Sequence, residues 1–94
     1  MHVTIRSYTG AGALADAMAA KAADVEKIIR GVPGFIAYHA VREGDQVTTV
    51  TVCQDKAGTD ESTNRARAWV KENVPQGVGA PKISEGDTFI SFSK

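Results

Sequence analysis

The chain has 94 residues, eleven basic and eleven acidic side chains, and a formal net charge of zero. This length predicts a single domain over residues 1–94, and the balanced charge argues against nucleic-acid and anionic-membrane partners, which select basic surfaces. A single cysteine excludes an internal disulfide and a cysteine zinc cluster, and the lack of a charged leader or of an apolar run of about 18–20 residues predicts a cytoplasmic location.

The periodicity of the apolar residues predicts the first two elements. Residues His2–Tyr8 alternate as a strand that carries Arg6 and Tyr8 on the same face. Residues Gly12–Arg30 are predicted to form one helix, which ends before Gly31. The apolar stripe of this helix consists of Leu14, Met18, Ala22, Val25, Ile29 and Val32.

Two strands, Phe35–Arg42 and Gln46–Gln54, are predicted to form a hairpin. Their aromatic and β-branched residues suit a pleated surface, and Gly44 followed by Asp45 fits a two-residue type II′ turn. In that register one face carries Phe35, Ala37, His39, Val41, Thr48, Val50 and Val52. The other face carries Ile36, Tyr38, Ala40, Arg42, Val47, Thr49, Thr51 and Cys53, and a three-residue turn would reverse one strand relative to the other. Because both faces are partly apolar, we expect both to be covered.

The remaining elements complete a recognisable order. A second helix is predicted at about Asp60–Asn73 with Thr59 as its N-cap, and a last strand at about Lys82–Ser93 with a bulge or bend at Gly86. The order β-α-β-β-α-β is ferredoxin-like: an α+β fold with a four-stranded antiparallel sheet and two helices on one face. The uncovered face predicts a homodimer in which the sheets of two copies pack together.

Three stretches carry a resemblance to a known family. They are Val32-Pro33-Gly34-Phe35, Val50–Asp55 continuing into Lys56-Ala57-Gly58, and Trp69–Asn73. With them the whole chain resembles the dimeric α+β barrel proteins grouped with the antibiotic-biosynthesis monooxygenases. The resemblance implies a homodimer with a small cleft between sheet and helices in each subunit. It also implies, as one activity of the group, cofactor-independent oxygenation of polycyclic aromatic or quinol-like compounds.

Haem cleavage is another activity of that group, and the sequence argues against it. The haem-cleaving members use an Asn on the first strand, a Trp on the second helix and a His further along that helix. Trp69 matches the second of these residues. Arg6 stands where the Asn would be needed, however, and no His follows His39.

Five residues are candidates for a site. Trp69 either fills the core or forms the wall of a pocket against a flat ligand, and both hold if the core is hollow. Arg6 and Tyr8 either bind a phenolate or carboxylate, or are polar residues of the dimer interior or rim. His39, with Tyr38 beside it, suits a general base that makes a substrate carbanion able to pass an electron to oxygen. The alternative for His39 is a partly buried histidine of the interface.

No metal site and no cofactor are predicted. The two histidines lack the spacing of a metal site, and His2, near the chain terminus, is expected to be solvated. Two functions of different class are consistent with the sequence. The first is a cofactor-independent monooxygenase acting on a small aromatic or quinol-type compound; the alternative is a non-catalytic dimer with a ligand-binding or structural role, because fold alone does not imply function.

Overall fold

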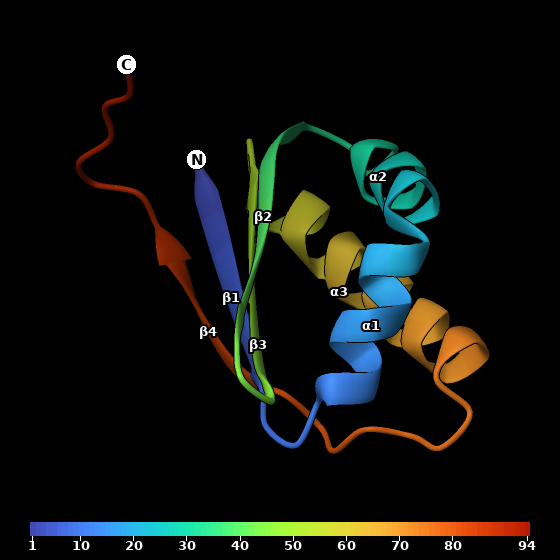
Figure 1. Cartoon of the computed structure of the whole chain (residues 1–94). Helices are drawn as coiled ribbons and strands as arrows, with labels where there is room; N and C mark the ends of the chain where they lie inside the picture. The colour runs from blue at the N-terminus through green and yellow to red at the C-terminus, as the bar shows by residue number, and fades with distance from the viewer.

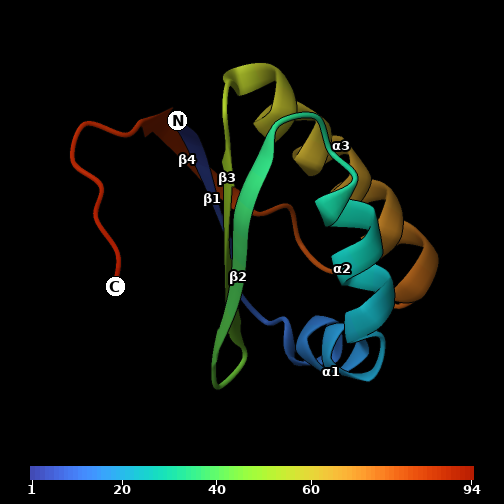
Figure 2. The same ribbon diagram turned by 90° about the horizontal axis from the view of Figure 1, so that it is seen from above.

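The computed structural model describes all 94 residues. The four strands form one antiparallel sheet in the order β2-β3-β1-β4. All three helices lie on one face of this sheet, and the C-terminal residues extend on the other side (Figures 1 and 2). The predicted α+β ferredoxin-like class is confirmed, with three helices in place of two. The elements in chain order are β1 (His2–Tyr8), α1 (Gly12–Ala20), α2 (Ala22–Arg30), β2 (Phe35–Glu43), β3 (Gln46–Cys53), α3 (Lys56–Asn73) and β4 (Lys82–Asp87).

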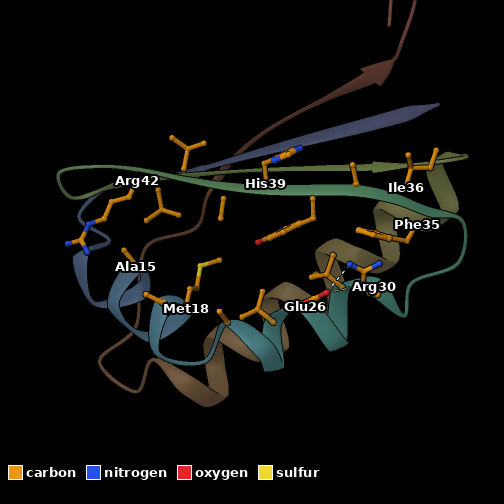
Figure 3. Close-up of a pocket in the computed structure, with 17 residues that line it drawn as sticks. Ala15, Met18, Glu26, Arg30, Phe35, Ile36, His39 and Arg42 are labelled. Carbon is orange, nitrogen blue, oxygen red and sulfur yellow. Dashed lines mark hydrogen bonds and ion pairs between the residues drawn. The ribbon is translucent and has the colours of Figure 1, made fainter. Parts of the chain in front are cut away.

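The β2–β3 hairpin has the predicted register. His39 pairs with Val50, and Gly44 has the positive φ of 58° that the turn requires. The assignment of residues to the two faces was wrong at one end only. The register shifts between Phe35 and Ala37, and such a bulge moves the residues before it to the opposite face. Phe35 therefore lies on the helix side of the sheet, whereas Ile36 lies on the far side (Figure 3).

The predicted helix over residues 12–30 is two helices. The backbone leaves helical geometry at Lys21, where φ is −121° and ψ is 36°, and α2 runs in a different direction from α1 (Figures 1 and 2). Neither glycine nor proline stands at the break, so the usual sequence signals for a helix end are missing. After the break, α1 packs against β3, whereas α2 packs against the edge strand β2.

Helix α3 begins four residues before its predicted start. Its N-cap is Asp55, whose side chain accepts a hydrogen bond from the backbone N–H of Gly58 at 3.3 Å. Thr59, the predicted N-cap, instead lies inside the helix and is buried. Gly58 is buried where the first turn of α3 packs against Cys53 of β3 and the Pro33 carbonyl oxygen.

Strand β4 ends at Asp87, six residues before its predicted end. It pairs with β1, and the last pair joins Asp87 to His2 at the start of the chain, so no partner strand remains for residues beyond it. Gly86 pairs in regular register with Val3, and the predicted bulge is absent there. The tail over residues 88–94 leaves Phe89 and Phe92 almost fully exposed.

The two faces of the sheet differ in what covers them. The core lies under the helices and contains Tyr8, Ala11, Leu14, Ala15, Val47, Trp69 and Val74. The opposite face carries apolar side chains without cover from this chain, including Ile5 and the 58% exposed Val41. None of the three helices combines the length and the apolar character of a membrane span.

Candidate functional site

A cleft of about 640 Å³ lies between the edge strand β2 and helices α1 and α2. Most of its lining is apolar, with Met18 on one wall and Phe35 on the other (Figure 3). The guanidinium of Arg30 stacks over the Phe35 ring at 5.8 Å and pairs with Glu26 at 2.8 Å. We call this space the outer cleft. Its volume and its apolar lining suit a small apolar molecule.

A second, smaller space of about 30 Å³ lies deeper, between the sheet and α3. We call it the inner pocket. Four residues line both spaces, so the two are neighbours: Met18, Val25, Ile29 and Tyr38. The inner pocket is also lined by Arg6, Tyr8, Thr49, Arg65 and Trp69, and its lining includes no carboxylate.

The alternation of the strands and one face of α3 bring four of the predicted site residues together here. On β1 the buried residues are the even-numbered ones, which places Arg6 and Tyr8 under the helices. Tyr38 pairs with Thr51 and points to the same side. Trp69, which is 8% exposed, belongs to the core and also lines the inner pocket; its contact with a flat ligand stays a prediction.

Arg6 is the most unusual residue of the site. Its side chain is only 1% exposed, and its guanidinium takes part in no salt bridge. It donates to three hydroxyl groups: Nη1 to Thr63 Oγ1 at 2.8 Å and to Ser62 Oγ at 3.3 Å, and Nη2 to Thr51 Oγ1 at 3.0 Å. Nε has no partner, and neither has the buried hydroxyl of Thr49.

The phenols and the thiol that the charge of Arg6 influences remain neutral at neutral pH. Burial raises the pKa of Tyr8 above its ordinary value, and the charges of Arg6 and Arg67 only partly oppose this shift. Burial raises the pKa of Tyr38 in the same way, again against the charge of Arg6. Burial also raises the pKa of the Cys53 thiol. At neutral pH these groups therefore offer proton donors and acceptors, but no counter-charge for the guanidinium.

His39, the predicted base, lies apart from the other four residues. It borders the outer cleft along β2, but its side chain points to the opposite face of the sheet and is exposed (Figure 3). It pairs with Val50, a residue of the face that the helices do not cover. Within one chain, His39 therefore faces the surface proposed for dimerisation and not the cavity.

Several residues of the site were not anticipated as such. Thr51, Ser62 and Thr63 hold the Arg6 guanidinium. Arg65 lines the inner pocket and donates to the carbonyl oxygen of Ile28 at 3.0 Å. The one available signal was Ser62, a hydroxyl on the inner face of the predicted helix, where an apolar residue is expected.

His2 is not solvated, contrary to the prediction for it. It is buried at the end of the sheet because β4 lies beside it, and its ring nitrogens contact Glu85 at 2.9 Å and Asp87 at 3.1 Å. Lys56 also contacts Glu85, at 3.2 Å. The hydrogen bonds to Glu85 and then to Asp87 raise the pKa of His2. No residue of this cluster lines the inner pocket, and the cluster connects β4 with β1 and α3.

By sequence the chain matches no family model and no curated protein. By structure it is similar to a protein of unknown function from Nitrosomonas europaea (TM-score 0.74, 18% identity, covering 99% of this chain and 93% of that one). It is also similar to a mutant form of SnoaB, a cofactor-independent oxygenase from Streptomyces nogalater (0.69, 12%, 99% and 97%). A third similar structure is the ActVA-Orf6 monooxygenase of Streptomyces coelicolor in complex with nanaomycin D (0.71, 15%, 99% and 91%).

The chain has the antibiotic biosynthesis monooxygenase fold. Further similar structures, from Chloroflexus aurantiacus and Deinococcus radiodurans among others, carry that description provisionally. Identities below 20% establish a shared fold and leave the activity to the site itself. The resemblance stated from the sequence is thus confirmed for the fold.

Proposed function

We propose that the protein is a cofactor-independent monooxygenase that acts on a small aromatic or quinol-type compound. One observation carries the proposal: an apolar cleft of about 640 Å³ adjoins an inner pocket that Arg6, Tyr8, Tyr38 and Trp69 line together. The cleft suits the ring system, and the polar groups of the pocket suit its oxygen. Two of the structures with the same fold are described as an oxygenase and a monooxygenase, which agrees with this reading.

The chemistry needs only the substrate and dioxygen. Loss of a proton converts a phenol or quinol with an activated ring carbon into an anion that can give an electron to dioxygen. The resulting radical pair combines to form a carbon–oxygen bond, and protonation yields a hydroperoxide. Loss of water from the hydroperoxide leaves a carbonyl, so one oxygen atom of O₂ enters the product and the other becomes water. The role of the protein is to hold the anion away from bulk water.

The groups that can exchange a proton inside the cavity are the phenols of Tyr8 and Tyr38. Both are neutral, and both lie within the influence of the Arg6 charge. His39 remains a candidate base only if the assembly brings its exposed ring to a substrate. Because both phenols keep their protons at neutral pH, they can donate hydrogen bonds to the substrate anion and give a proton to the peroxide, while the proton of the substrate passes to solvent.

The protein acts as a homodimer in this proposal. The uncovered face of the sheet carries Ile5, Val41 and other apolar residues. The same face of a second copy of the chain is equally apolar and would cover it. The tail with Phe89 and Phe92 extends on this same side of the sheet (Figures 1 and 2). An interface of this kind would bury about 2,000 Å² or more. Sedimentation as a 9.9 kDa monomer at micromolar concentration would contradict the dimer.

Oxygen uptake tests the activity. Purified protein treated with a chelator is incubated with a panel of quinols and fused-ring phenols, and dioxygen consumption is compared with that of the same compounds alone. A monooxygenase consumes oxygen above this background with at least one compound. The alternative, a non-catalytic binding or structural dimer, gives no increase with any of them and would replace the proposal.

A further inference from the structure

The inner pocket contains a buried positive charge without a counter-charge. The guanidinium of Arg6 is 1% exposed, and its hydrogen-bond partners are the neutral hydroxyls of Ser62, Thr63 and Thr51. A buried charge is costly unless it is paired. Proteins rarely keep such a group without a partner, and an arginine cannot discard its charge by losing its proton.

Two unused hydrogen-bonding groups indicate where the partner would bind. Nε of Arg6 has an N–H without an acceptor, and the hydroxyl of Thr49, which is 3% exposed, has no partner either. Both residues line the inner pocket. An oxygen atom in this pocket would accept from Nε and use the Thr49 hydroxyl as a second donor.

The charged residues that line the pocket favour the binding of a negatively charged ligand. The second charged residue of the lining is another arginine, Arg65, and no Asp or Glu lines the space. Tyr8 and Tyr38 stay protonated, because burial raises the pKa of each phenol by more than the nearby arginine lowers it. No group of the pocket itself therefore neutralises Arg6, and a negatively charged ligand would do so.

The volumes limit which part of a ligand enters. The inner pocket measures about 30 Å³, and a space needs roughly 10–15 Å³ on this measure to hold one water molecule. An oxygen atom and the carbon that bears it fit, whereas a ring does not. The ring system then lies in the neighbouring outer cleft of about 640 Å³, which Tyr38 and Met18 also line.

We propose that the inner pocket is an oxyanion site in which Arg6 binds the deprotonated phenolic oxygen of a fused-ring ligand whose apolar body lies in the outer cleft. This inference rests on the proposed function for the identity of the ligand as a substrate. It assigns Arg6 the role of stabilising the substrate anion from which an electron passes to dioxygen. A charge-assisted hydrogen bond to a buried guanidinium is about twice as strong as a neutral one, so binding should favour ionisation.

The test measures the ionisation of a bound phenol. 2-Naphthol is titrated with pH by absorbance in the presence and absence of the wild-type protein. We expect the pKa of the bound naphthol to fall by about one unit or more, which corresponds to about a tenfold preference for the anion. 2-Naphthoate is the second probe. Because it carries two oxygens and an additional carbon, it should bind more weakly than the naphtholate.

Two variants separate Arg6 from the general charge of the cavity. Arg6→Met removes the buried guanidinium and should abolish the shift, whereas Arg67→Met removes an exposed cation that lines neither space and should preserve it. An unshifted naphthol pKa with the wild type would overturn the inference, as would tighter binding of naphthoate than of naphtholate. Equal loss of the shift in both variants would also overturn it. If Arg6→Met does not fold, the wild-type titration and the Arg67 variant decide.

Oxygen consumption plays no part in these measurements. A protein that lowers the pKa of bound naphthol but consumes no oxygen with any phenol retains the oxyanion site and loses the monooxygenase proposal. A protein that turns over a quinol but leaves the pKa of bound naphthol unchanged retains the monooxygenase proposal and loses the oxyanion site.

Discussion

Trp69→Ala should cost about 3–5 kcal/mol of unfolding free energy. The indole is 8% exposed and belongs to the core cluster. The inner pocket beside it measures about 30 Å³, far less than the indole, so most of the removed volume becomes a new cavity. The total stability of a domain of this size is about 5–15 kcal/mol. The substitution therefore removes a large share of it.

Urea titration followed by far-ultraviolet circular dichroism measures this cost. Fluorescence is unsuitable because Trp69 is the only tryptophan. Wild type and variant need the same protein concentration, since dimerisation makes apparent stability concentration-dependent. Lys71→Ala, an exposed change on the same helix, is the control and should alter stability by less than about 0.5 kcal/mol. A loss below about 1 kcal/mol for Trp69→Ala would refute the reasoning that the indole is a packed core residue.

Three further changes have expected outcomes. Gly58→Ala should destabilise the protein by about 1–3 kcal/mol, because a Cβ there would collide with the Pro33 carbonyl oxygen; unchanged urea midpoints would contradict this. His2→Asn should cost most between about pH 4.5 and 6.5 and least in alkaline solution. Because the pKa of His2 is raised in the folded state, the stability that protonated His2 adds is lost as the pH rises. Because the pKa of Glu85 is lowered, the stability that its carboxylate adds is lost as the pH falls. A cost that is equal at all pH values would refute the pairing. His39→Gln should leave oxygen consumption within about threefold of wild type, because the ring lies outside the cavity; a loss of about 100-fold, the scale of general-base catalysis, would restore His39 as the base.

Local pattern was sufficient for much of the fold and for part of the site. Alternation along β1 placed Arg6 and Tyr8 on one face, and the turn at Gly44 set the register that separates Tyr38 from His39. The pattern did not reveal which face the helices cover, because both faces carry apolar residues. That choice depends on how the helices pack against the whole sheet, and it decides that Tyr38 lies in the cavity and His39 outside it.

The features that were missed depend on distant parts of the chain. Strand β4 ends where its partner β1 begins, at the pair of Asp87 and His2, so its length is not encoded in its own residues. The break at Lys21 has neither glycine nor proline to mark it. The Arg6 guanidinium is held by hydroxyls 45 to 57 residues away in sequence. Threonine and serine are too common in strands and helices for spacing alone to identify them as its partners.

The origin of the oxygen in the product tests the central claim most directly. The chelator-treated protein is given a quinol with a free ring carbon under isotopically labelled dioxygen, and the hydroxyquinone, which carries one oxygen atom more than the quinol, is analysed by mass spectrometry. We expect one labelled oxygen atom per product molecule and the other label in water, with the product formed faster than in the protein-free control. A product with unlabelled oxygen, or formation of product no faster than in the control for every quinol tested, would contradict the assignment of this cavity as a monooxygenase site.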